Sequence, residues 1–251
     1  MKGRVFMTAN TVHTDRKKHR KSGGMQSPDF LMRHPVFSVT IILLSIMIFG
    51  ILAYFVLQKG SLVKWDLDVV NRMHAVALSS PEWIKNVMLA GDYLGKQGYI
   101  ATGVILGLYF LIKRFWKELF MVIVLYAGQV ILFLGLGNFF ARQRPVFTEN
   151  IGIVISYPSF PSGHMMSAVI MFGLLAYFIV PKISSWAGKT AAILLAVFLV
   201  FFIGYSRFFM GAHYITDVIA GIALGVAWVT LVILSIEMIS GKVVKENEKE
   251  K

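Results

Sequence analysis

Long apolar blocks separated by short polar turns dominate this chain of 251 residues and restrict what it can fold into. The blocks are roughly 18 to 24 residues long, and a helix needs about 20 residues to cross the hydrocarbon core of a bilayer. Hydrophobic residues make up 57% of the chain and charged residues only 15%, whereas a soluble domain is about half apolar and about a quarter charged. The mean hydropathy is +0.69. The sequence therefore predicts an integral membrane protein, built as one all-α, polytopic helix bundle.

Six transmembrane helices are expected within a single catalytic domain, residues 36–240. Their expected ranges are 36–57, 99–112, 119–140, 165–180, 190–205 and 215–239. Between the first two spans, residues 59–96 mix apolar side chains such as Trp65 and Leu67 with charged ones such as Asp66. That pattern is typical of helices lying on the membrane surface, and Ser80-Pro81 divides the stretch into two short interfacial helices.

Basic residues are distributed unevenly along the chain and predict its orientation. Residues 1–35 are expected to form a disordered basic tail, and 241–251 a short charged tail. With six spans both tails lie on one side, which holds 17 of the 25 lysines and arginines, against 8 on the other. The positive-inside rule then places both termini in the cytoplasm.

The net charge of +12 raises the alternative of a nucleic-acid-binding protein. Eight basic residues, however, lie in the first 33 positions, ahead of the first apolar block, as is usual for a tail beside anionic lipid. Membrane lipids, and not nucleic acid, are therefore the expected partners. The chain has no cysteine, which excludes disulfides and thiolate metal sites. Nothing in the sequence specifies an oligomeric state.

Three polar segments, residues 142–145, 157–164 and 206–217, lie at the ends of expected spans. The predicted topology brings all three to the face opposite the termini. Arg142, Arg144 and Arg207 are costly at a lipid boundary unless they meet anions, and a guanidinium donates two parallel hydrogen bonds to phosphate. Ser162-Gly163 precedes a span, where the free N–H groups of a helix N-terminus also favour an anion. Together these groups predict a phosphoryl-binding site.

Two histidines in the same segments can act on a bound phosphate. His213 and Asp217 are four residues apart, hence on one helical face, and a carboxylate beside an imidazole fixes its tautomer. His213 is a candidate nucleophile that would form a phosphohistidine. His164, from another segment, is a candidate for protonating the leaving oxygen and later activating water. No set of carboxylates resembles a magnesium site, so no metal and no cofactor are expected.

The motifs Arg144-Pro145, Pro161-Ser-Gly-His164 and Ser206-Arg207-x5-His213-x3-Asp217 resemble the three signature motifs of the type 2 phosphatidic acid phosphatase (PAP2) superfamily. The resemblance covers roughly residues 36–240. It implies that Arg144, Arg207, Ser162 and Gly163 bind phosphate. It further implies that His213 is the nucleophile, Asp217 its orienting partner and His164 the general acid, and that the enzyme works without a metal.

One position departs from the family pattern. The first motif normally opens with a lysine seven residues before Arg144, and that position is Gly137 here. Arg142 either substitutes for this lysine in binding phosphate or only extends to lipid head groups. A lost charge-assisted contact costs about 1.5 to 3 kcal/mol, enough to weaken binding without abolishing it.

The expected function is hydrolysis of a lipid phosphomonoester or diphosphate on the extracytoplasmic face of a cell membrane, with a bacterial membrane as the expected setting. Undecaprenyl diphosphate is the first substrate expected, followed by phosphatidylglycerol phosphate and phosphatidic acid. Two alternatives remain open at this point. The protein is a phosphotransferase that passes the group to a second lipid or sugar, or it is a non-enzymatic lipid-binding or transport protein.

Overall fold

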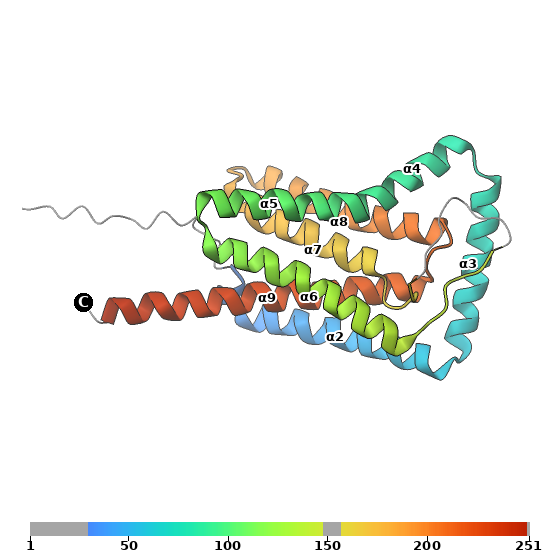
Figure 1. The fold of residues 1–251 in the computed structure, drawn as a ribbon, viewed down its shortest axis with the longest axis horizontal. Coiled ribbons are helices and arrows are strands. Elements are labelled where there is room, and N and C mark those ends of the chain that lie inside the picture. Colours follow the sequence, from blue (N-terminus) through green and yellow to red (C-terminus); the bar gives the residue numbers. More distant parts are fainter. Residues whose placement is uncertain (1–29, 148–156, 250–251) are drawn as a thin grey trace, which may run out of the picture.

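The computed structural model describes residues 30–147 and 157–249, and all regular secondary structure in those ranges is helical (Figure 1). The long helices lie alongside one another in a bundle, as the sequence predicts. They are α2 (Pro35–Gln58), α5 (Tyr99–Lys113), α6 (Trp116–Phe140), α7 (Gly163–Ile179), α8 (Trp186–Phe209) and α9 (Ile215–Lys249). A 3-10 turn, η2 (Val180–Lys182), extends α7.

Five helices in the described ranges are long and apolar enough to span a membrane on their own: α2, α6, α7 with η2, α8 and α9. The remaining expected span corresponds to α5, which has only 15 residues. A π-helical turn, η1 (Leu94–Gly98), precedes α5 without a break. At about 1.5 Å per residue, the stretch from Leu94 to Lys113 is about 30 Å long, which matches the hydrocarbon thickness.

The tails differ from expectation where they are described. Residues 1–29 and 250–251 of the expected tails lie outside the described residues. Phe30–Arg33 form a short helix, α1, and the Met32 N–H donates to Glu237 Oε2 of α9 at 2.8 Å. Helix α9 runs on to Lys249, beyond the expected end of the last span at residue 239. Part of each predicted tail is therefore helical.

Helix α7 lies at the centre of the core. Its residues Met165, Ile170 and Leu174 are fully buried, because α8 and α9 pack along it. Residues with buried apolar side chains on several faces are typical of a helix surrounded by protein. The start of α7, which carries His164, is thereby fixed from several sides.

Gly221 of α9 permits this close packing at the start of α7. A Cβ added at Gly221 would lie 2.5 Å from the carbonyl oxygen of Ser162 and 2.8 Å from Met165 Cβ. We expect Gly221→Ala to destabilise the protein by about 1 to 3 kcal/mol, because a backbone atom must move, and to lower activity. Thermal unfolding in detergent measures this. Gly107→Ala is the control, since no atom lies within 4 Å of its added Cβ; equal unfolding temperatures for both variants would contradict the prediction.

Helix α3 (Ser61–Ser79) lies across one end of the bundle, and α4 (Glu82–Tyr93) leads back from it to η1 (Figure 1). Two helices are thus present in the stretch where the sequence predicts interfacial ones. Trp65 and Leu67 are 48% and 45% exposed, while Asp66 is buried. The reason is tertiary: Asp66 finds an arginine partner, and in a membrane protein exposed apolar side chains have lipid to contact. The polar segments gather at this same end.

Candidate active site

The end of α6 directs the first polar segment, residues 142–145, back towards the bundle. Ala141 adopts a left-handed conformation (φ 45°), and its N–H donates to the Gly137 carbonyl at 2.8 Å. Helices commonly end on such a residue, because it turns the chain off the helical path. The chain after Ala141 then runs back across the starts of α7 and α9, where the Ser159 N–H donates to the Arg142 carbonyl at 2.8 Å.

Arg144 is held by backbone carbonyls from two other segments. Its Nε donates to the Tyr157 carbonyl at 2.7 Å and its Nη1 to the Ala212 carbonyl at 2.6 Å. Burial and the nearby charge of Arg207 lower the pKa of Arg144 to about 10, against the opposing effect of Asp217. The guanidinium therefore stays charged at neutral pH and is preorganised beside His213.

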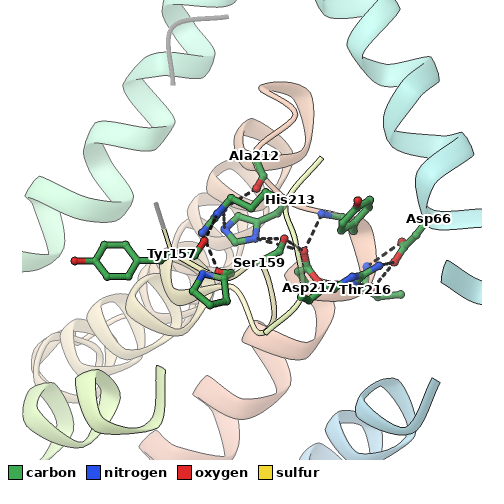
Figure 2. A network of polar contacts seen from close by, with 11 residues as sticks. Asp66, Tyr157, Ser159, Ala212, His213, Thr216 and Asp217 are labelled. Carbon is green, nitrogen blue, oxygen red and sulfur yellow. Dashed lines mark hydrogen bonds and ion pairs between the residues drawn. The ribbon is translucent and has the colours of Figure 1, made fainter. Parts of the chain in front are cut away.

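His213 is fully buried, and Figure 2 shows it beside Ser159 and Asp217. Its Nε2 lies 3.0 Å from Arg144 Nη1. Arginine has only donors, so Nε2 accepts and carries the lone pair, and the proton resides on Nδ1. Burial, then the charges of Arg144, Arg207 and His164, holds the pKa of His213 well below its usual value. The ring is therefore neutral at physiological pH, and its Nε2 would become accessible if Arg144 moved aside.

Asp217 faces the other nitrogen of that ring. Its Oδ2 lies 3.5 Å from His213 Nδ1, and Ser159 Oγ, which donates to the same Oδ2, is also 3.5 Å from Nδ1. These separations are long for hydrogen bonds, as is common in sites without substrate. The carboxylate accepts further hydrogen bonds from the Tyr214 N–H at 3.0 Å and from Arg142, so its position is fixed.

Arg142 is occupied by two carboxylates. Its Nη1 lies 2.6 Å from Asp217 Oδ1, and its Nη2 lies 2.8 Å from Asp66 Oδ2. The guanidinium also stacks 4.0 Å from the centre of the Tyr214 ring. These contacts correct the expectation that Arg142 replaces the missing lysine or reaches lipid head groups. Its guanidinium donates to the carboxylates of Asp66 and Asp217 instead. It links α3 to α9 and so orients Asp217.

Asp66 forms the α3 end of this link, and its removal is expected to lower both stability and activity. It accepts hydrogen bonds from Arg142 and from Thr216 at the start of α9. Removing one partner of a buried ion pair typically costs about 3 to 5 kcal/mol. We expect Asp66→Ala to lower thermal stability in detergent and to reduce kcat by misplacing Asp217.

The matched control is Asp68→Ala, on an exposed position of the same helix. An Asp66→Ala protein that unfolds at the control's temperature with unchanged kcat would show that the link is dispensable.

Arg207 and His164 meet at a second acid, Asp92 of α4. Asp92 accepts a hydrogen bond from Arg207 Nη1, and its Oδ1 is 3.1 Å from His164 Nε2, close enough for an ion pair but not aligned as a hydrogen bond. Burial raises the pKa of Asp92, but the adjacent His164 and the charge of Arg207 outweigh it and lower the pKa below its usual value. Asp92 is thus an anion placed between Arg207, which is predicted to bind phosphate, and His164, the predicted general acid.

A cavity of about 570 Å³ opens onto these groups. Its polar lining includes Asp92, Lys96, Arg144, His164 and Arg207, together with the start of α7 at Gly163. Apolar side chains from α4, α5 and α6 complete the wall. A site of this size, apolar with a few convergent charged groups, suits a phosphorylated amphiphile.

Several buried donors at this site make no hydrogen bond in the described part of the chain, although one of them, His164 Nε2, is ion-paired with Asp92. They are Nε and Nη2 of Arg207, Nε2 of His164 and Oγ of Ser162. Buried polar groups are almost always hydrogen-bonded, so a cluster without partners points to a missing ligand. All four donors belong to residues that the sequence predicts to bind or act on phosphate.

The structure therefore brings the predicted residues together in two groups. Arg144, His213 and Asp217 form one, and His164 and Arg207 the other. Arg144, His164 and Arg207 line the cavity, whereas His213 and Asp217 are fully buried beside Arg144. Ser162 and Gly163 begin α7 beside both, and the Ser162 N–H donates to the Asp217 carbonyl at 3.1 Å.

Three residues of this site, Ser159, Asp92 and Asp66, were not predicted from the sequence. The only indication for Ser159 was its position within the polar segment 157–164. Asp92 is an acid four residues before Lys96, just ahead of an expected span, and that placement could have marked it. Asp66 gave no signal, since acids are ordinary in a surface helix.

The chain resembles known membrane phosphatases in sequence and structure. A model of the PAP2 superfamily matches residues 114–240. Phosphatidylglycerophosphatase B of Bacillus subtilis (strain 168) is 30% identical over 155 residues, which cover 60% of this chain and 74% of that protein. The crystal structure of a transmembrane PAP2-type phosphatidylglycerolphosphate phosphatase from Bacillus subtilis superposes with a TM-score of 0.66 at 28% identity, covering 76% of this chain and 93% of that one. The family match spans half of the chain, and it includes all three polar segments: this protein belongs to the PAP2 superfamily.

Proposed function

We propose that this membrane lipid phosphatase hydrolyses a lipid phosphomonoester by way of a phosphohistidine on His213. The observation that carries the proposal is the set of buried donors on Arg207, His164 and Ser162 that make no hydrogen bond in the described part of the chain. Arg207 and His164 line the cavity together with Arg144, and Ser162 immediately precedes Gly163, which also lines it. A phosphoryl group, with its several acceptor oxygens, would satisfy these donors together.

In the first step, Nε2 of His213 attacks phosphorus, so that an N–P bond forms as the P–O bond to the lipid breaks. His164 gives its Nε2 proton to the departing lipid oxygen, and a lipid alcohol leaves. The Nδ1 proton of His213 is held by Asp217 and Ser159, which stabilise the positive charge that develops on the ring. Arg144 exchanges its contact with His213 Nε2 for a phosphate oxygen, which uncovers the nucleophile.

In the second step, His164 takes a proton from water, and the water oxygen attacks phosphorus. The N–P bond breaks, its electron pair returns to His213, and inorganic phosphate is released. Arg144 and Arg207 stabilise the charge on the phosphoryl oxygens in both steps. These steps consume one water and need no further reactant.

Phosphatidylglycerol phosphate is the first substrate to test, because both similar proteins carry that activity in their names. Undecaprenyl diphosphate and phosphatidic acid are the next candidates. The experiment is a phosphate-release assay in detergent on these three lipids, with phosphatidylglycerol, a phosphodiester, as the negative control. Release of free phosphate from at least one of the three is expected. Release from none, or transfer of the phosphoryl group to an added lipid or sugar acceptor instead of water, would overturn the hydrolase proposal.

We also propose that the site faces the extracytoplasmic side, supported by the excess of lysine and arginine on the side of the termini. The chain has no cysteine, so single cysteines report sidedness directly. In intact cells, a membrane-impermeant maleimide should label Glu82→Cys at the site end but reach Lys182→Cys, at the far end of α7, only after permeabilisation. The reverse pattern would invert the orientation.

A further inference from the structure

Three basic side chains line the cavity, and they differ in what they already contact. Arg207 donates to Asp92, and Arg144 donates to backbone carbonyls and His213. Lys96 is exposed, and within residues 30–147 and 157–249 its ammonium makes no hydrogen bond or ion pair within 4.0 Å. Its three donors are therefore available to a ligand in the cavity.

The π-helical turn η1 brings Lys96 to the site. Gly95, the preceding residue, packs so closely that an added Cβ would lie 3.2 Å from His164 Cδ2 and 3.0 Å from Ile203 Cγ2. The backbone at Lys96 is thus one residue away from a direct contact with the candidate acid. Isolated π turns inside helices frequently occur at functional sites.

Position 137 approaches the same site from α6 but carries no side chain. Among the described residues, a Cβ at Gly137 would meet only Pro158, at 3.8 and 3.9 Å. The Pro158 carbonyl accepts a hydrogen bond from Arg144 Nη2 at 3.2 Å. Phe133, one turn earlier on α6, lines the cavity. A lysine therefore fits at 137 and would lie beside Arg144, yet glycine stands there.

The charge balance of the cavity makes a third cation useful. A phosphomonoester carries about 1.5 to 2 negative charges at neutral pH. Arg144 and Arg207 bring two positive charges, but Asp92 offsets one of them. Lys96 restores the second positive charge, which matches the anion.

We propose that Lys96 binds a non-bridging oxygen of the substrate phosphoryl group and so takes the role that Gly137 leaves open. The cation of the first motif is thereby supplied from η1 instead of from α6. This inference rests on the proposed function, since it places a lipid phosphate in the cavity.

The test compares Lys96→Met with wild type, using short-chain phosphatidylglycerol phosphate in detergent. Loss of one charged hydrogen bond is expected to raise KM about tenfold, with a smaller change in kcat. The Kd of inorganic phosphate, obtained from thermal stabilisation at increasing phosphate concentrations, should rise by a similar factor. Lys96→Arg, which keeps the charge, should have a KM between those of wild type and Lys96→Met. Lys113→Met, an exposed lysine at the far end of α5, is the matched control and should behave as wild type.

A substitution at position 137 gives an independent test of Lys96. Gly137→Lys added to Lys96→Met should recover most of the lost affinity, because the new ammonium approaches the same anion from α6. If the double variant binds substrate no more tightly than Lys96→Met, a cation at position 137 cannot replace Lys96. Unchanged KM and phosphate affinity in Lys96→Met, or equal losses in Lys113→Met, would overturn the assignment of Lys96. A wild-type protein that neither releases nor binds phosphate would refute the proposed function first, and Lys96 with it.

Discussion

Replacing His213 by glutamine is expected to slow phosphate release by about 10⁴-fold or more, the scale seen when a covalent nucleophile is removed. Glutamine keeps an acceptor for Arg144 but has no ring nitrogen that can form a stable N–P bond. Because the side chain is fully buried, the loss should appear in kcat, while affinity for inorganic phosphate changes little. Phosphate release from the preferred lipid, together with thermal stabilisation by inorganic phosphate, measures the two effects separately.

His34→Gln is the control for this variant, since His34 is exposed at the start of α2. It should keep wild-type activity. Retention of more than about a tenth of the activity by His213→Gln would exclude a phosphohistidine at this position and direct attention to attack by water.

His164→Gln is expected to lower turnover of a lipid phosphate by about 10² to 10⁴-fold, the usual contribution of a general acid or base. The size of the loss should depend on the leaving group. 4-Nitrophenol is a far stronger acid than a lipid alcohol, so its anion leaves without a proton from His164. The second step still needs a base, and the phosphohistidine should therefore accumulate with 4-nitrophenyl phosphate.

Rapid mixing of His164→Gln with 4-nitrophenyl phosphate should show a burst of nitrophenolate of about one equivalent per protein, followed by slow turnover. Intact-protein mass spectrometry should find one added phosphoryl group, which the His164→Gln, His213→Gln double variant lacks. Equal losses with both substrates and no burst would remove His164 from the role of acid in the first step.

The helix bundle and the three polar segments were predictable because each depends on residues close in the sequence. Apolar block length sets the spans, and the spacing of His213 and Asp217 follows from one helical turn. The contribution of α3 and α4 was not predictable in this way. Asp66 is buried because Arg142, from a distant segment, neutralises it, and Asp92 reaches Arg207 because Gly91 packs against Ser206. Such pairings are decided by tertiary contacts, and the alternation of apolar and charged residues in 59–96 does not encode them.

The guanidinium of Arg144 lies across His213 Nε2, and this arrangement bears on how the enzyme treats the rest of the bilayer. Most phospholipids around it are diesters with a net charge of about minus one or zero, and they compete weakly for an arginine that already donates to three backbone carbonyls. A terminal phosphate, with its second charge, competes far better. In the proposed mechanism, the imidazole of His213 is therefore uncovered only by the group that it would attack, and the structural lipids of the membrane would be spared.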